Sequence, residues 1–224
     1  MKNSILEIAH RGYSQNYKDN TILSFKEAIN NDFDIIELDI QITKDDDIII
    51  FHDTYIEDKI NNSHLFIFEL TTKEIKKIDP DIPTLNEFFS NIDTSKHNIY
   101  LDIKGSKKIV PYLLSFLNDY ETSKIYIGSF NILMIDQMNM LNPKLNYGII
   151  SETMFTSDLI DIMVKKYNLK FFCFHWSVLQ HNEINYLKQK NILVFTYTNK
   201  LEIILDRMIQ FNVDGIVTNC KIKS

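Results

Sequence analysis

Short runs of β-branched and apolar residues alternate with segments of helical period along almost the whole chain. Apolar residues recur at helical spacing over 22–29, 110–117, 159–167 and 201–209. Strands that alternate with single helices run parallel and are joined by crossovers, so an α/β fold is expected. The strand-like runs are Ile5–Ala9, Ile35–Ile40, Ile48–Phe51, Ile99–Ile103, Ile125–Ile127, Asn146–Ile150, Phe171–Phe174, Leu193–Tyr197 and Gly215–Thr218.

The number of repeating units favours a closed barrel. About eight βα units in 224 residues suit a compact (β/α)8 TIM barrel, and no glycine-rich nucleotide-binding loop follows the first strand. One irregularity lies between the second and third runs, because Thr43–Asp47 is too short for a crossover helix. With no linker or internal repeat, residues 1–224 are expected to form one domain.

Composition excludes several classes of protein. The chain has 24 Lys and Arg against 30 Asp and Glu, so no basic excess is available to bind nucleic acid. No apolar stretch is long enough for stable membrane insertion or for a secretory leader. The two cysteines make no disulfide framework, and a cytoplasmic location is expected. Nothing in the sequence predicts an oligomeric state.

Carboxylates in the expected strands point to a metal site. Glu37 and Asp39 share one face of the apolar run DIIELDI, and a central parallel strand has no solvated face. Two inward carboxylates repel each other unless a cation lies between them. Together with Asp102, which lies on another strand, they predict a divalent cation such as Mg²⁺ or Ca²⁺, because both prefer oxygen ligands.

Other polar side chains at strand ends suggest an anion site with acid–base groups. His10 and His52 are candidate proton-transfer residues near neutral pH, and Arg11 and Lys104 are candidates for holding a phosphate. Trp176 is compatible with a substrate-binding wall at the barrel mouth and equally with packing at a strand end.

The motifs resemble those of the glycerophosphodiester phosphodiesterase family over nearly the whole chain. AHRG at 9–12 and DNT at 19–21 resemble its AHRG and ENT segments, and IELDIQITKDDDIIIFHD at 36–53 resembles its metal and histidine core. Later segments resemble the family in the same order, namely IPTLNEFF at 82–89, LDIKG at 101–105, GSFN at 128–131, FHWSVL at 174–179, FTYTN at 195–199 and VDGIVTN at 213–219.

The resemblance implies a (β/α)8 barrel that hydrolyses glycerophosphodiesters to glycerol 3-phosphate and an alcohol with a divalent metal ion. It implies that His52 is the general acid and His10 the general base, and that Arg11 contacts the phosphate. Glu37 and Asp39 match two metal ligands, and Asp102 stands where the family usually has Glu, one methylene longer. Asp19 likewise replaces the family's Glu, whereas its Lys is present as Lys104.

Two other functions are weighed against this one. A lysophospholipase D-like phosphodiesterase would need an apolar surface for an acyl chain, and no hydrophobic insertion after His52 is expected to supply it. A non-catalytic metabolite-binding barrel is compatible with the fold, since fold does not fix function. The histidine pair beside three carboxylates argues against this second alternative.

Overall fold

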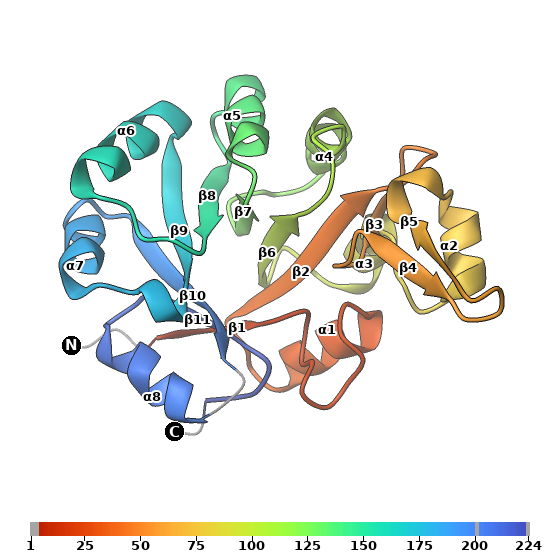
Figure 1. Cartoon of the computed structure of the whole chain (residues 1–224), viewed down its shortest axis with the longest axis horizontal. Helices are drawn as coiled ribbons and strands as arrows, with labels where there is room; N and C mark the ends of the chain where they lie inside the picture. The colour runs from red at the N-terminus through yellow and green to blue at the C-terminus, as the bar shows by residue number, and fades with distance from the viewer. Residues whose placement is uncertain (1–4, 200–201, 223–224) are drawn as a thin grey trace.

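The computed structural model, which describes residues 5–199 and 202–222, contains a closed barrel of eight parallel strands (Figure 1). Neighbouring strands follow the order β1, β11, β10, β9, β8, β7, β6 and β2, and β1 pairs with β2 to close the ring. These strands are β1 Leu6–Ala9, β2 Ile35–Ile42, β6 Asn98–Ile103, β7 Ile125–Ser129, β8 Asn146–Ser151, β9 Leu169–His175, β10 Leu193–Asn199 and β11 Gly215–Thr218. The expected (β/α)8 barrel is confirmed.

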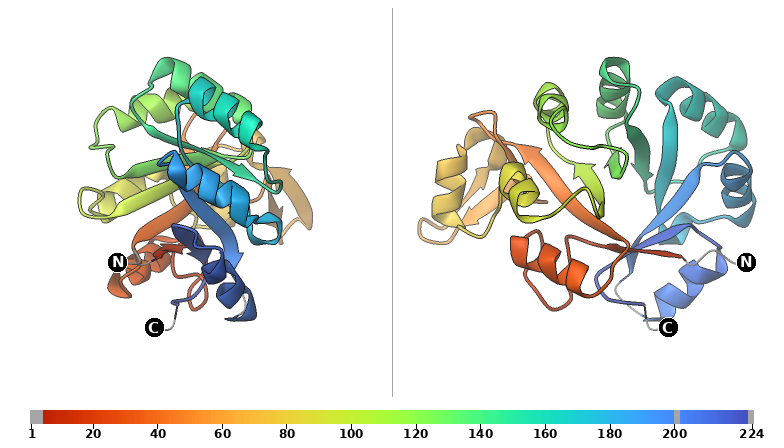
Figure 2. Two further views of the ribbon diagram at one scale, coloured as in Figure 1. Left: turned by 90° about the vertical axis from the view of Figure 1, so that its left-hand side faces the viewer. Right: turned by 180° about the vertical axis from the view of Figure 1, so that it is seen from behind.

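Helices surround the barrel on its outside (Figure 2). They are α1 Ile22–Asn30, α3 Leu85–Asn91, α4 Ile109–Leu117, α5 Ile132–Leu141, α6 Ser157–Tyr167, α7 His181–Gln189 and α8 Glu202–Gln210. Leu201, the first residue of the expected last helix, lies outside the described residues. No helix in the described ranges combines the length and the apolarity that crossing a bilayer requires.

The expected irregularity is a hairpin. Strand β3, Ile48–Ile50, returns antiparallel to β2. The run Ile48–Phe51 is therefore the one of the nine strand-like runs that does not enter the barrel. The turn is tight because the Thr43 N–H donates to the Asp47 carbonyl at 2.9 Å, and Asp46 takes a left-handed φ of 66°. Such a φ is tolerated by Asp better than by most residues.

An added segment follows this hairpin, which differs from the sequence expectation. It contains β4 Tyr55–Asp58, β5 Ser63–Phe66, a 3₁₀ turn at Ile67–Glu69 and α2 Thr72–Ile78, and it projects from one side of the barrel (Figure 1). Its inner face packs into a small cluster that includes Ile49, Ile56 and Ile75. Four-residue strands with one buried face leave little periodicity to detect in a sequence, so the segment escaped prediction.

Aromatic rings fill the barrel interior below the site. Phe171 of β9 lies 5.3 Å from the Tyr100 ring and 5.2 Å from the Phe195 ring, between ring centroids. Gly148 of β8 makes room for this arrangement, since a Cβ there would lie 2.4 Å from Phe171. The rings form a packed floor, and polar side chains occupy the carboxyl ends of the strands above it.

Candidate active site

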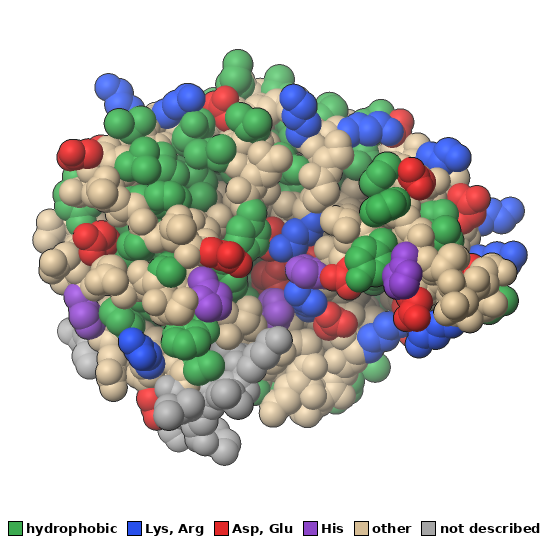
Figure 3. Space-filling view, viewed as in Figure 1, with side chains coloured by type: hydrophobic (Ala, Val, Ile, Leu, Met, Phe, Trp, Pro, Cys, Tyr) green, Lys and Arg blue, Asp and Glu red, His purple; other side chains and the backbone are tan. Residues whose placement is uncertain are grey.

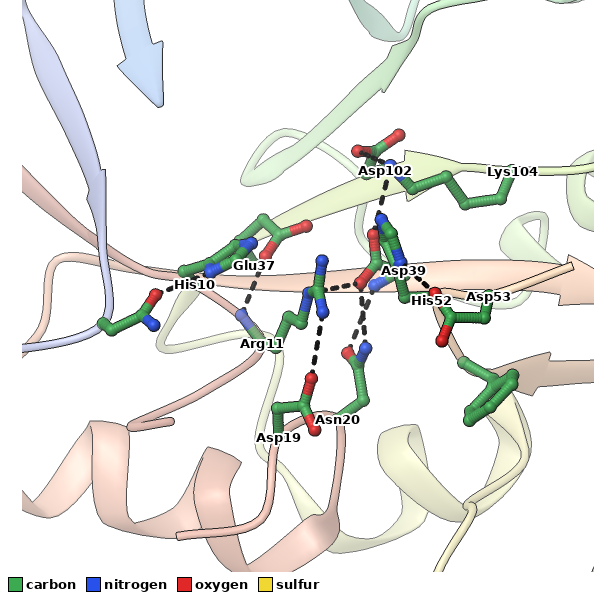
Figure 4. A network of polar contacts seen from close by, with 12 residues as sticks. His10, Arg11, Asp19, Asn20, Glu37, Asp39, His52, Asp53, Asp102 and Lys104 are labelled. Carbon is green, nitrogen blue, oxygen red and sulfur yellow. Dashed lines mark hydrogen bonds and ion pairs between the residues drawn. The ribbon is translucent and has the colours of Figure 1, made fainter. Parts of the chain in front are cut away.

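The turn after β1 is built by backbone conformations that only certain residues adopt well. Gly12 has a φ of 77°, and a Cβ at this position would lie 2.4 Å from the Ser24 hydroxyl. Arg11 also has a positive φ, 56°, which turns its backbone N–H toward Glu37 Oε2 at 2.8 Å. The AHRG segment thus seats its turn against α1 and places His10 and Arg11 at the barrel mouth (Figure 4).

Three carboxylates converge inside the barrel. Glu37 and Asp39 come from β2, and Asp102 comes from β6, directly beside Asp39 in the strand register. All three are buried, and one oxygen of each lies within 4.8 Å of the others. Negative charges this close together and this shielded from water need positive charges or hydrogen-bond donors beside them.

Neighbouring groups supply part of that compensation, mostly to Asp39 (Figure 4). Arg11 Nε lies 3.0 Å from Asp39 Oδ2, and the Asn20 side-chain amide donates to the same oxygen at 2.8 Å. Lys104 Nζ lies 2.6 Å from Asp102 Oδ2 and 3.3 Å from Asp39 Oδ1. The Asp39 carboxylate therefore has three polar contacts, one with each of three partners, whereas Glu37 accepts a single backbone hydrogen bond.

The pKa values follow this distribution. Burial works to raise the pKa of Asp39, but the cations of Lys104 and Arg11 hold it below its ordinary value. Burial and the charges of Asp39 and Asp102 raise the pKa of Glu37 well above its usual range. Burial raises the pKa of Asp102 to about 6 although Lys104 opposes the shift. The protein's own cations do not fully neutralise the cluster.

The cluster fits a hard divalent cation. Asp102 Oδ1 is buried without a hydrogen-bond partner, and Asp102 belongs to the same group of carboxylates as Glu37 and Asp39. Oxygen-only donors of this kind suit Mg²⁺ or Ca²⁺. A cation there would compensate Glu37 and give Asp102 Oδ1 the partner that it lacks.

His10 lies at the end of β1 in a setting that keeps its ring neutral. Burial and the nearby Arg11 charge lower the pKa of His10 to about 4. Its Nδ1–H donates to Asn219 Oδ1 at 2.6 Å, just beyond the end of β11. An amide oxygen accepts this proton and leaves the other nitrogen, Nε2, as an acceptor. A neutral imidazole with a free lone pair is the form that a general base requires.

His52 comes from outside the barrel, in the segment after β3. Its Nδ1 lies 2.7 Å from Asp53 Oδ1, and its side chain is 39% exposed. Gln41 of β2 fixes this segment, because its side-chain amide donates to the Phe51 and Asp53 carbonyls at 2.7 and 2.8 Å. Asp53 accepts the hydrogen bond at Nδ1 and so holds the imidazole in one orientation.

These side chains line one cavity of about 260 Å³ at the barrel mouth, in a region where acidic, basic and histidine side chains gather (Figure 3). The structure brings together seven of the residues singled out from the sequence, namely His10, Arg11, Glu37, Asp39, His52, Asp102 and Lys104. Trp176 does not line the cavity and instead packs, partly buried, against the apolar layer between the strands and the helices. Its role in substrate binding stays a prediction.

Sequence reasoning missed the residues that support this set. Asn20 and Gln41 lie inside two of the motifs quoted above, so their positions in the sequence could have indicated a place near the site. Asn219 lies 209 residues from His10, and only the closed barrel brings the two together. Residues from the opposite side of the mouth were also missed, and they are Phe130, Glu152 and Tyr197.

Comparison with known proteins agrees with this geometry. The model of the glycerophosphoryl diester phosphodiesterase family matches residues 10–221. The glycerophosphodiester phosphodiesterase of Caldanaerobacter subterraneus subsp. tengcongensis is 29% identical over 96% of this chain and 93% of its own length. The Bacillus subtilis glycerophosphodiester phosphodiesterase is 26% identical over 96% of this chain and 83% of its own length.

Solved structures show the same fold. The glycerophosphodiester phosphodiesterase of Thermotoga maritima superposes with a TM-score of 0.84 at 22% identity, covering 98% of this chain and 96% of that one. An Oleispira antarctica phosphodiesterase, in complex with the product sn-glycerol-3-phosphate, superposes with a TM-score of 0.84 at 19% identity over 96% and 92% of the two chains. Because the family model spans nearly the whole described barrel, this chain belongs to the glycerophosphoryl diester phosphodiesterase family and is a phosphoric diester hydrolase.

Proposed function

We propose that this chain hydrolyses small glycerophosphodiesters to glycerol 3-phosphate and an alcohol, with a divalent cation and two histidines as acid and base. The observation that carries the proposal is the placement of a neutral His10 and a carboxylate-paired His52 in one cavity with the three buried carboxylates. The names of the similar enzymes and the glycerol 3-phosphate bound to the Oleispira protein support the substrate class.

The phosphate group would bind between the two cations of the mouth. Arg11 and Lys104 each keep a charged nitrogen on the cavity wall while pairing with Asp39. Charged donors of this kind neutralise phosphoryl oxygens both in the bound diester and in the transition state. Asp39 would hold the two cations in place for that contact.

Glu37, Asp39 and Asp102 would hold the divalent cation, which we infer to be Mg²⁺ or Ca²⁺ from the all-oxygen donor set. When bound, the ion supplies charge that polarises the phosphoryl oxygens. Asp102 is one methylene shorter than the Glu usual in the family, which makes the choice of ion a property of this chain to be measured.

The proton transfers divide between the histidines. His10 would accept a proton at Nε2 from the attacking oxygen, which belongs to water or to a neighbouring substrate hydroxyl. Asn219 would keep the Nδ1 proton in place during this step. His52 would donate its Nε2 proton to the oxygen of the departing alcohol, while Asp53 keeps the other ring proton. Each transfer avoids an unstable oxyanion or oxonium species.

The test measures release of glycerol 3-phosphate from glycerophosphocholine, glycerophosphoethanolamine and glycerophosphoglycerol. The protein is first dialysed against EDTA and then supplied with Mg²⁺, Ca²⁺ or Mn²⁺ separately. We expect negligible release without a cation, restored release with at least one of them, and loss in His10→Ala. His64→Ala, in an exposed histidine of β5, is the matched control. Failure to release glycerol 3-phosphate with every cation would refute the proposal.

One observation favours a second candidate, a lysophospholipase D-like activity. The added segment after His52 exposes Tyr55, Phe66 and Phe68, and Tyr55 pairs across the hairpin with Phe66. These rings offer an apolar surface next to the segment that carries His52. Adding lysophosphatidylcholine to the substrate panel decides between the candidates, because this activity would release choline from it faster than from glycerophosphocholine.

A further inference from the structure

The cavity has a second wall that the proposed chemistry does not use. His10, Arg11 and the three carboxylates come from β1, β2 and β6, on one side of the ring. The other wall contains Phe130 after β7, Glu152 after β8 and Tyr197 of β10. In the strand order, β8 lies opposite β1, so this wall faces the phosphate-binding side across the mouth.

The aromatic part of the second wall presents ring surface to the cavity. Phe130 is 47% exposed, and its ring meets the Tyr197 ring edge-on with centroids 5.8 Å apart. Lys104 Nζ already lies 5.1 Å from the Phe130 centroid. This contact shows that a cation can lie over the Phe130 ring, and the Lys104 charge itself is offset by Asp102 and Asp39.

Glu152 adds a negative charge to the same wall. It is exposed, and it forms neither an ion pair nor a hydrogen bond through its side chain with any residue in the described part of the chain. The remaining carboxylates on the cavity wall are the three buried ones across the mouth. A carboxylate that lines the same cavity as two aromatic rings is a combination that attracts an ammonium group by both charge and ring quadrupole.

We propose that Phe130, Tyr197 and Glu152 form a subsite for a positively charged alcohol moiety, such as choline or ethanolamine. The inference rests on the proposed function, because it takes the phosphate to lie between Arg11 and Lys104. A diester held there extends one substituent toward the opposite wall. An ammonium group on that substituent would meet Glu152 and the aromatic rings, whereas a neutral polyol would gain only hydrogen bonds.

The experiment isolates charge by comparing two substrates of nearly the same shape. Glycerophosphocholine carries a trimethylammonium group, and its 3,3-dimethylbutyl analogue carries a neutral tert-butyl group in the same place. We expect wild-type kcat/KM to favour the choline ester, and Glu152→Gln to reduce this preference by about two- to five-fold, as for an exposed charge pair. Phe130→Leu, which keeps apolar bulk without a π face, should reduce it by a similar factor.

The control and the alternative outcomes separate this inference from the proposed function. Glu69→Gln, in an exposed residue away from the cavity, should leave the ratio unchanged. Release of glycerol 3-phosphate from glycerophosphoglycerol tests the hydrolysis itself without any cationic group. If Glu152→Gln lowers kcat/KM equally for both esters, Glu152 binds the glycerol hydroxyls and the inference is wrong. No preference for choline in the wild type would also overturn it.

Discussion

His10 and His52 reach the same cavity from two regions that are built differently. His10 follows the barrel strand β1, is partly buried, and is held by Asn219 from the far end of the chain. His52 lies in the segment after the β2–β3 hairpin, is partly exposed, and is held by Asp53, its neighbour in sequence. The first region depends on the closure of the barrel, and the second on local contacts.

The difference in construction gives the two histidines different hydrogen-bond partners. An amide oxygen fixes the His10 tautomer without adding charge, so burial and Arg11 dominate and lower its pKa. A carboxylate, that of Asp53, is the partner of the His52 Nδ1 at 2.7 Å. The proposed assignment of His10 as the base and His52 as the acid agrees with the roles implied by the family resemblance.

The largest expected effect is a different response of the two histidine variants to a change of leaving group. His52→Ala should lose roughly 10²–10⁴-fold activity on glycerophosphocholine, because choline alkoxide needs a proton. It should lose far less on a p-nitrophenyl phosphodiester, because nitrophenolate departs as an anion. His10→Ala should be poor on both substrates, since the attacking oxygen must lose its proton in either case. Steady-state kcat/KM for both variants and both substrates checks this.

The reverse pattern would exchange the roles of the two regions. If His10→Ala were rescued by the nitrophenyl leaving group and His52→Ala were not, His10 would be the acid. Equal losses for both variants on both substrates would mean that the histidines position groups without transferring protons. His64→Ala again serves as the control, because this exposed histidine is outside the cavity.

The next effect concerns the carboxylates where the two regions meet. Because the pKa of Glu37 is raised, the folded protein without a cation binds the Glu37 proton more tightly than the unfolded chain does. The contribution of Glu37 to the free energy of unfolding therefore falls as pH rises. Glu37→Gln mimics the protonated form and should leave the cation-free protein at least as stable near neutral pH. Wild type should gain about 2.7 kcal/mol of stability when the Mg²⁺ or Ca²⁺ concentration is 100 times the dissociation constant, and Glu37→Gln should lose this gain.

Thermal unfolding with and without the cation measures this difference without any activity assay. Asp102→Glu is the companion variant, since it restores the residue usual in the family and keeps a carboxylate. We expect it to bind a cation, with a changed preference between Mg²⁺ and Ca²⁺. Equal stabilisation of wild type and Glu37→Gln by both cations would remove Glu37 from the metal site.

The contrast between the two regions also explains what the sequence could predict. The barrel followed from alternating periods, and Glu37, Asp39 and both histidines followed from strand-end motifs whose parts are close in sequence. Asn219 could not be paired with His10 from sequence, because barrel closure alone joins them. The added segment after His52 escaped prediction for a different reason, since its two short strands contain a single buried residue, Ile56.

A smaller effect tests the His10 region by giving it the kind of partner that His52 has. Asn219→Asp places a carboxylate beside Nδ1 and should raise the pKa of His10 from about 4 by at least about one unit. The base is active when neutral, so a higher pKa means that activity on the acid side is lost at higher pH. We expect the ratio of variant to wild-type kcat/KM to fall between pH 7 and pH 5. Asn212→Asp, an exposed change of the same charge, should leave the ratio flat.

The smallest effect tests whether the local partner of His52 acts through that histidine. Asp53 is 61% exposed, so its pair with His52 is screened by water, and exposed pairs of this kind contribute roughly 0.2–1 kcal/mol. Asp53→Asn should therefore reduce kcat/KM on glycerophosphocholine by only about two- to five-fold. The reduction should disappear on the p-nitrophenyl substrate, because no proton is needed there. It should also disappear in a His52→Ala background, because a residue that works only through its partner has no further effect once the partner is gone. A loss that persisted in the double variant would mean that the Asp53 carboxylate supports the cavity by a route that does not pass through His52.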